Sequence, residues 1–368
     1  SHILGEGKVK AGDRVLLVFL PSLDFIVAFL ACLRAGVIAV PVYPPDPRRV
    51  RAYITAFAHT AASCGSRVAL THAAYLNSVS LSGLKSAATA LFSFGGGAAR
   101  EAVSSVTAAW PDIAWINMST VGSGGGGGGG KAAALDAAPR AAIAFLQYTS
   151  GSTAEPKGVM ISHGNLAANL ATIVRSLAAG TDTVVASWLP QYHDMGLIGS
   201  LLGTLYCGGS GGYMSPLSFI KRPVAWLDLA SRIHATHLQT PNFGLRLVTR
   251  KWGEAAVRPP LDLHTVRHIF NAAEPISPAA IQDFCATFAP ARLPPAAMAP
   301  GYGLAENCVY VSDGGSRVLT LDRAAFELQR VVVTSSTTLA DLTAPGARRV
   351  ETSGTAVEAV SCGPVAPH

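Results

Sequence analysis

A stretch of hydroxyl side chains around one glycine, closed by a lysine, carries the strongest chemical signal in the chain. It lies in LQYTSGSTAEPKGVMISHGNL, residues 146–166, directly after the apolar run 143–148. Glycine permits a turn in which N–H groups and hydroxyls converge on one anion, and lysine adds a positive charge. The residues are Thr149, Ser150, Gly151, Ser152, Thr153 and Lys157. They predict a phosphate-binding loop without Walker spacing, and an ordinary Ser/Thr turn with a surface lysine is the alternative.

Three other polar motifs follow predicted strands. They contribute His193 and Asp194 from SWLPQYHDMGLIG, Ala273 and Glu274 from IFNAAEPIS, and Tyr302, Gly303 and Glu306 from GYGLAENCVYVS. Open α/β sheets bind ligands outside the carboxyl ends of their strands, so we expect these motifs to line a site. The structural alternatives are a hydrogen-bonded histidine at 193, core packing of Tyr302, and a solvated helix start at Glu306.

The elements that must position these residues alternate along the chain. Apolar runs predict strands at 15–20, 37–42, 143–148, 184–188, 235–238 and 266–271. Helical spacing predicts helices at 24–35, 166–177, 223–231, 244–251 and 278–288. This alternation is typical of an α/β fold with mostly parallel β-sheets between layers of helices.

Composition suggests three parts. We expect a first α/β subdomain at 1–117, a glycine-rich low-complexity linker or insertion at 118–140, and a second α/β subdomain at 141–368. The glycine run 125–130 and Lys131 resemble the start of a Walker loop, but Ala132 replaces the required Ser or Thr. A second superficial match, GGSGG around Ser210, fits the hydrolase nucleophile elbow, but glycine flexibility argues against that role.

Composition also excludes several classes of protein. The net charge of +6 over 368 residues is mild, and no basic stripe with aromatic residues suggests a nucleic-acid partner. The most apolar stretch, 15–42, is interrupted by Pro21, Asp24 and Arg34, so we expect no transmembrane segment. The six cysteines lack zinc-site spacing, which predicts reduced thiols and a cytoplasmic protein. Because the first residue is serine, removal of an organelle-targeting peptide is kept as an alternative.

Taken in order, these motifs resemble the adenylate-forming ligases, and among them the fatty acyl-AMP ligases. The likeness also includes GDRVLLVFLPSLDFIVAFLACLRAGVIAVPVYPP, MSPLSFIKRP and TPNF, and it runs from about residue 12 to 364. LTLDRAAFELQRVVV, residues 319–333, resembles the extra segment that separates these ligases from acyl-CoA synthetases. The resemblance implies the large N-terminal domain of this family, with two mostly parallel sheets.

The resemblance implies a reaction and a set of roles. ATP and Mg²⁺ would activate a fatty acid to acyl-AMP with release of pyrophosphate, and an acyl carrier protein would receive the acyl group, often in polyketide synthesis. Glu306 would hold Mg²⁺ and Lys157 a phosphate. Tyr302 would stack on adenine in a pocket lined by Ala273, Glu274 and Gly303. His193 would sit beside the substrate carboxylate, which is already ionised and needs no general base.

Some features depart from the family pattern. Ala154 stands where glycine is common, and the glycines of CGGSGGYMSP replace β-branched residues, which weakens a strand. The chain also ends at VSCGPVAPH, before the ribose-binding aspartate, the hinge and the small C-terminal domain with its lysine. We therefore expect a truncated large domain. The alternatives are a long-chain acyl-CoA synthetase and a catalytically incomplete acyl-adenylate-binding or interaction domain.

Overall fold

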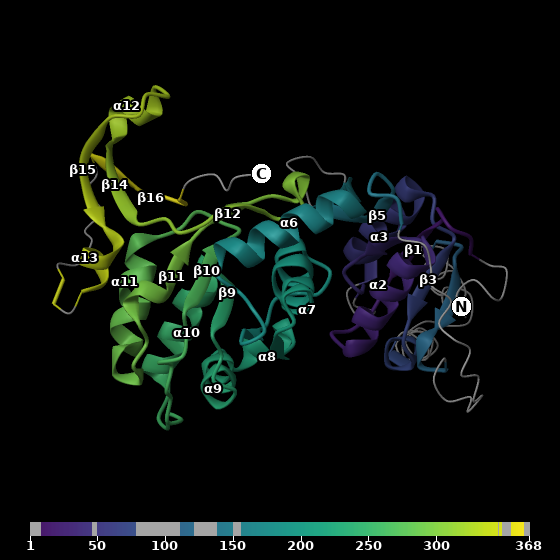
Figure 1. Cartoon of the computed structure of the whole chain (residues 1–368), viewed down its shortest axis with the longest axis horizontal. Coiled ribbons are helices and arrows are strands. Elements are labelled where there is room, and N and C mark those ends of the chain that lie inside the picture. Colours follow the sequence, from purple (N-terminus) through teal and green to yellow (C-terminus); the bar gives the residue numbers. More distant parts are fainter. Residues whose placement is uncertain are drawn as a thin grey trace, which may run out of the picture. The chain divides into compact units, whose positions relative to one another are not determined.

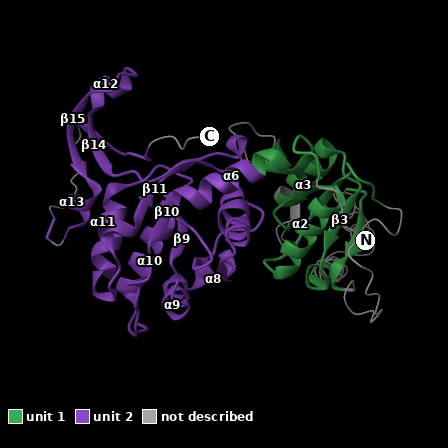
Figure 2. Ribbon diagram, viewed as in Figure 1, with its two compact units in different colours: residues 1–166 green, residues 167–368 purple. Residues whose placement is uncertain are grey.

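The computed structural model (Figure 1) describes residues 9–45, 50–78, 111–120, 138–149, 156–344, 346–347 and 355–363. The chain forms two compact units, residues 1–166 and 167–368, drawn in green and purple in Figure 2. Each unit is built on its own sheet of mainly parallel strands. The expected α/β class is therefore confirmed.

The first unit contains a six-stranded sheet in the order β4-β3-β1-β2-β5-β6. The strands are β1 (Arg14–Leu17), β2 (Ile38–Pro41), β3 (Val68–Thr71), β4 (Ala114–Asn117), β5 (Ile143–Thr149) and β6 (Lys157–Ser162). All pair in parallel except β6, which runs antiparallel to β5. The helices are α2 (Leu23–Ala35), α3 (Val50–Cys64) and the short η1 (Met118–Thr120). Leu16, Val40, Phe57 and Tyr75 share one buried cluster, which holds α3 to the sheet.

The second unit contains a five-stranded parallel sheet in the order β11-β10-β9-β7-β8. The strands are β7 (Val184–Ser187), β8 (Ser210–Tyr213), β9 (His237–Pro241), β10 (His268–Ala272) and β11 (Met298–Pro300). The helices are α6 (His163–Ser176), η2 (Met195–Leu202), α7 (Gly203–Cys207), α8 (Pro216–Lys221), α9 (Val224–Arg232), α10 (Asn242–Glu254), α11 (Pro278–Phe288), η3 (Ala289–Ala291) and η4 (Pro295–Ala297). Because α6 starts at residue 163, it crosses the division between the units.

Antiparallel pairs follow the parallel sheet. β12 (Tyr302–Gly303) pairs with β13 (Tyr310–Ser312), and η5 (Ala305–Asn307) lies between them. β14 (Arg317–Asp322) pairs with both β15 (Val333–Thr338) and β16 (Ala356–Val360), beyond α11 in Figure 1. Helix α12 (Arg323–Glu327) lies between β14 and β15, and α13 (Leu339–Thr343) follows β15. The segment 319–333 is thus a projecting hairpin, and it exposes Phe326, Leu328 and Val331.

One expectation about organisation differs from the structure, whereas the rejection of a nucleophile elbow at Ser210 agrees with it. We expected residues from 141 onward to form the second subdomain, but Phe145 of β5 pairs with Ala39 of β2, and the division falls after Leu166. A short apolar strand fits either sheet, so its own sequence does not specify its partner. Ser210 lies inside β8, paired with Val184, and not in the turn between strand and helix that a nucleophile elbow needs. The glycine run 125–130 and Ala154 lie outside the described residues.

The elements themselves agree with the sequence. The predicted strands correspond to β1, β2, β5, β7, β9 and β10, and the predicted helices to α2, α6, α9, α10 and α11, with ends shifted by a few residues. Among the described residues, no helix combines the length and apolar character needed to cross a membrane.

His237 is buried on β9, between β7 and β10. Its Nε2 lies 2.9 Å from the carbonyl oxygen of Leu177, and its Nδ1 lies 2.8 Å from the hydroxyl of Thr236. A neutral ring fits both contacts, since Nε2–H donates to the carbonyl and Nδ1 accepts from the hydroxyl. Burial lowers the pKa of His237 to about 4, so the folded unit keeps this imidazole neutral.

We predict that the second unit loses stability as the pH falls from 6.5 to about 4. In this range the unfolded chain binds a proton at His237 and the folded unit does not, which lowers the free energy of unfolding by at most about 3 kcal/mol. Urea unfolding followed by tryptophan fluorescence at several pH values measures this loss. The loss should shrink in His237→Asn and persist in the exposed-site control His264→Asn. Equal pH dependence in His237→Asn and wild type would contradict the assignment.

Candidate active site

The polar motifs of the second unit lie at the carboxyl ends of neighbouring parallel strands. β10 and β11 pair with Asn271 opposite Pro300, so Ala273 and Tyr302 each follow two residues later. β9 pairs with β10 along its length, which brings the start of α10 to the same edge. Sheets of this kind bind ligands at this edge, so the structure brings these motifs together as their order in the sequence predicts.

Tyr302 and Gly303 form a short, closely packed hairpin with β13. Tyr302 is 52% exposed, so its aromatic face is accessible to a planar ligand. Position 303 requires glycine, because a Cβ there would lie 1.8 Å from the carbonyl oxygen of Val309. The two residues predicted to line an adenine pocket, Tyr302 and Gly303, therefore lie on a hairpin that tolerates few substitutions.

The turn after β10 has a strained backbone. Ala273 adopts a φ of +73°, a left-handed conformation that costs a residue with a Cβ about 1–2 kcal/mol. The next residue, Glu274, accepts a hydrogen bond from the N–H of Phe243, with 2.5 Å between Oε1 and the nitrogen. Strain of this kind is frequent at ligand-binding sites, so the turn stays a candidate for the predicted pocket.

His193 and Asp194 lie where the chain leaves β7 and enters η2. The Nδ1 of His193 lies 2.7 Å from Oδ1 of Asp194, and the same oxygen accepts from the N–H of Met195 at 2.6 Å. Asp194 therefore caps η2 and orients the imidazole. The hydrogen bond to this carboxylate raises the pKa of His193, although partial burial opposes the shift. The imidazolium, a positive charge, is thereby favoured here.

The π-helix η2 is tied to the sheet by buried polar contacts. Gly196, its second residue, lies in close contact with the preceding turn, since a Cβ would lie 2.1 Å from the carbonyl oxygen of Pro190. Ser200 lies 3.1 Å from the hydroxyl of Ser187 and donates to Oε1 of Gln239 at 2.7 Å. π-Helical turns are rare and frequent at functional sites. These residues were not predicted, since nothing local in the sequence pairs them.

Glu306 is exposed on η5, between β12 and β13. Asn169 of α6 holds this hairpin, since its side chain donates to the carbonyl of Tyr310 at 2.9 Å and accepts from its N–H at 3.1 Å. Asn307 adds a bond to the same carbonyl at 2.7 Å. Asn169 was also missed in the sequence, because it acts across 141 residues.

Glu306 fits a magnesium ion that is shared with a nucleotide. Within the described ranges, no group of three or more His, Cys, Asp or Glu side chains could hold a metal by itself. Mg²⁺ in phosphate-transfer sites uses one or two carboxylates together with phosphate oxygens and water, so a single exposed glutamate is sufficient protein ligation. The donor set therefore fits Mg²⁺ carried by ATP.

The predicted phosphate loop joins β5 and β6 of the first unit. Thr149 and Lys157 are paired across these antiparallel strands, so the two ends of the loop lie together. Lys157 is exposed, as a phosphate ligand requires. The loop residues Ser150, Gly151, Ser152 and Thr153 lie outside the described residues. The predicted strand before this motif is thus confirmed as β5, and the motif is followed by β6, which was not predicted.

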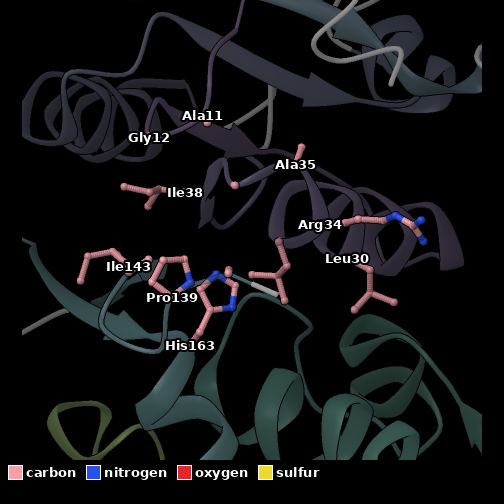
Figure 3. Close-up of a pocket in the computed structure, with 13 residues that line it drawn as sticks. Ala11, Gly12, Leu30, Arg34, Ala35, Ile38, Pro139, Ile143 and His163 are labelled. Carbon is pink, nitrogen blue, oxygen red and sulfur yellow. The ribbon is translucent and has the colours of Figure 1, made fainter. Parts of the chain in front are cut away.

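The first unit also contains a pocket of about 840 Å³, drawn in Figure 3. Leu33, Ile38 and Ile143 line it, and the ring of His163 lies beside that of Pro139. Partial burial lowers the pKa of His163, which favours a neutral ring. The residues that line this pocket include none of the predicted site residues, so the pocket is separate from the chemistry above.

We predict that Gly303→Ala destabilises the second unit. The added Cβ must displace the backbone at Val309, and forced overpacking costs about 1–3 kcal/mol. Urea unfolding measures the change. Gly253→Ala is the matched control, because a Cβ there meets nothing within 4 Å and should be neutral or stabilising. Equal stability of the two variants would contradict the close contact.

We predict that Asp194→Asn lowers the pKa of His193. The amide keeps much of the shape but removes the charge that favours the imidazolium. NMR titration of the His193 ring measures the shift, and Asp262→Asn, beside His264, serves as the distant control. An unchanged His193 titration in Asp194→Asn would show that this pair does not set the charge.

A family model and known relatives match the chain. The model of the AMP-binding enzyme family matches residues 1–333. The medium-chain-fatty-acid–[acyl-carrier-protein] ligase of Moorena producens is 33% identical, over 90% of this chain and 52% of that protein. The long-chain-fatty-acid–AMP ligase of Mycolicibacterium smegmatis is 32% identical, over 88% of this chain and 48% of that protein. The chain therefore spans about half the length of these relatives.

Solved structures agree with the sequence relatives. The crystal structure of a fatty acid AMP ligase from Legionella pneumophila has a TM-score of 0.73 at 30% identity, over 99% of this chain and 56% of that chain. A fatty acyl-adenylate ligase from the same organism, solved with acyl adenylate and pyrophosphate, has a TM-score of 0.71. With the family match over residues 1–333, this shared fold shows that the chain belongs to the AMP-binding, adenylate-forming enzymes, as its motifs suggested.

Proposed function

We propose that the protein containing this chain joins a fatty acid to AMP, with release of pyrophosphate from ATP. The observation that carries the proposal is the placement of the Ala273 turn and the exposed Tyr302 at the ends of two adjacent parallel strands. Such an edge offers an aromatic face and backbone groups to a nucleotide base. The ligase names of the relatives supply the acyl substrate.

The reaction must bring two anions together. At about 4 Å and an effective dielectric constant of about 20, two like unit charges repel by about 4 kcal/mol. A triphosphate carries several charges, so one lysine cannot neutralise them. Lys157, the N–H groups of its loop and Mg²⁺ would share this task, with the metal held by Glu306. Bound Mg²⁺ would neutralise the phosphate charge that the protein's own groups leave uncompensated.

His193 would orient the substrate carboxylate. Asp194 raises the pKa of His193, so a protonated ring can donate to and attract a carboxylate oxygen. The carboxylate of the acid is itself the nucleophile, and attack on the α-phosphorus forms the acyl–phosphate bond as pyrophosphate leaves. The histidine therefore positions a reactant and moves no proton in this step.

The acyl group would then pass to the phosphopantetheine thiol of an acyl carrier protein, in the cytoplasm. One relative is named as a ligase of this kind, while another, from Mycobacterium tuberculosis, is named a putative fatty-acid–CoA ligase. The six cysteines are all free, which suits a reducing compartment. Transfer assays with holo carrier protein and with CoA separate the two acceptors, and we expect the carrier protein to be preferred.

We predict that Lys157→Ala and Glu306→Ala each reduce fatty-acid-dependent ATP–pyrophosphate exchange by at least about 100-fold. Each removes a group that offsets phosphate charge, an effect worth about 3 kcal/mol in comparable electrostatic sites. Exchange is measured in the longest native protein that contains these 368 residues. The exposed-residue controls are Lys10→Ala and Glu254→Ala.

Wild-type exchange in both test variants would refute the assignment of the site. An absence of exchange in wild type, together with tight binding of an acyl-AMP analogue, would instead favour a catalytically incomplete acyl-adenylate-binding domain.

A further inference from the structure

Helix α10 begins without a cap from its own sequence. Its N-cap residue is Pro241, which has no side-chain acceptor, and its first turn contains no acidic residue. The first N–H groups of a helix need acceptors, which Ser, Thr, Asp or Asn usually provide. Glu274 takes this role from 31 residues away, because its Oε1 lies 2.5 Å from the nitrogen of Phe243. A carboxylate is also favoured at this positive end of the helix dipole.

The far end of the same turn is tied to α10 as well. Oδ1 of Asn242 accepts from the N–H of Ser277 at 3.1 Å, and Arg246 donates to the hydroxyl of Ser277 at 2.8 Å. Ser277 in turn caps α11, where its hydroxyl accepts from the N–H of Ala280 at 3.3 Å. The turn 273–277 is therefore fastened at both ends to the first turns of α10.

This turn contains a strained residue of the site. Ala273 adopts a φ of +73° although it has a Cβ. Such a conformation persists only when surrounding contacts impose it. Glu274 is the adjoining residue, so its bond to Phe243 acts directly on the backbone that follows Ala273.

We propose that Glu274 is a positioning residue for the nucleotide. By capping α10, its carboxylate holds the left-handed turn at Ala273 in the conformation that receives the adenine ring beside Tyr302. This role differs from direct contact with the base. The inference rests on the proposed function, because it assumes that an adenylate binds at this edge of the sheet.

The test compares the affinity of the 368-residue chain for AMP in matched variants, by titration calorimetry. Glu274→Ala should weaken AMP binding at least about ten-fold, which equals about 1.4 kcal/mol. Glu274→Gln retains an acceptor for the Phe243 N–H and should bind AMP like wild type. Glu254→Ala, at the other end of α10, is the control carboxylate and should also bind like wild type.

The double variant Ala273→Gly/Glu274→Ala is the decisive measurement. Glycine adopts a positive φ without steric cost, so it should restore most of the lost affinity if Glu274 acts by holding the turn. If the Glu274 side chain instead contacted the base directly, glycine at position 273 would not restore the lost contact. Failure of the double variant to regain affinity would therefore overturn the inference, as would wild-type affinity in Glu274→Ala.

Two further outcomes are also informative. If Glu274→Ala does not fold, the test uses Glu274→Gln instead and measures hydrogen exchange at the Phe243 amide. Slow exchange with wild-type AMP affinity supports positioning, and slow exchange with weakened affinity overturns it. If the wild-type chain binds neither AMP nor an acyl-AMP analogue, both the proposed function and this inference fail. If only the inference is wrong, the wild-type chain still binds these ligands.

Discussion

The candidate site depends on the parallel pairing of β9, β10 and β11. Because β10 lies between its neighbours in matched register, the turns that follow these strands open at one edge. The pairing continues beyond β11, where the N–H of Gly301 donates to the carbonyl of Asn271 at 2.9 Å. A slip of one residue would turn each strand's side chains to the opposite face and separate Ala273 from Tyr302. The register of three strands thus fixes the geometry of the candidate site.

Hydrogen bonds from buried or partly buried polar side chains hold the surrounding helices in defined places. Ser200 fastens η2 to β7 and β9, Asn169 fastens α6 to β13, and Trp226 fastens α9 to β7 through the carbonyl of Ala186 at 2.9 Å. A buried polar group is costly without a partner, so each bond excludes alternative positions of its helix. His237 adds a separate buried bond from β9 to the carbonyl of Leu177, just after α6, and burial keeps its ring neutral.

Each unit has a charged group on one of its predicted site motifs. Lys157 is exposed at the start of β6 in the first unit, and Glu306 is exposed on η5 in the second unit. The hydrogen bond of His193 to Asp194 raises the pKa of the imidazole, which stabilises its protonated form. Under the proposed function, exposed groups of opposite sign and a divalent cation would stabilise the phosphate charge while a carboxylate approaches. Burial raises the pKa of the Cys32 and Cys285 thiols to about 12, so both thiols stay protonated near neutral pH.

The sequence by itself determined the α/β class, most strands and helices around the motifs, and the motifs as ligand-binding candidates, because periodicity and turn chemistry are local properties. It could not assign β5 to the first sheet, give Ser210 its place in β8, or show that Glu274 caps α10. Those features depend on partners such as Ala39, Val184 and Phe243, far away in the chain. Only tertiary structure decided them, since long-range pairing leaves no mark on the local pattern of residues.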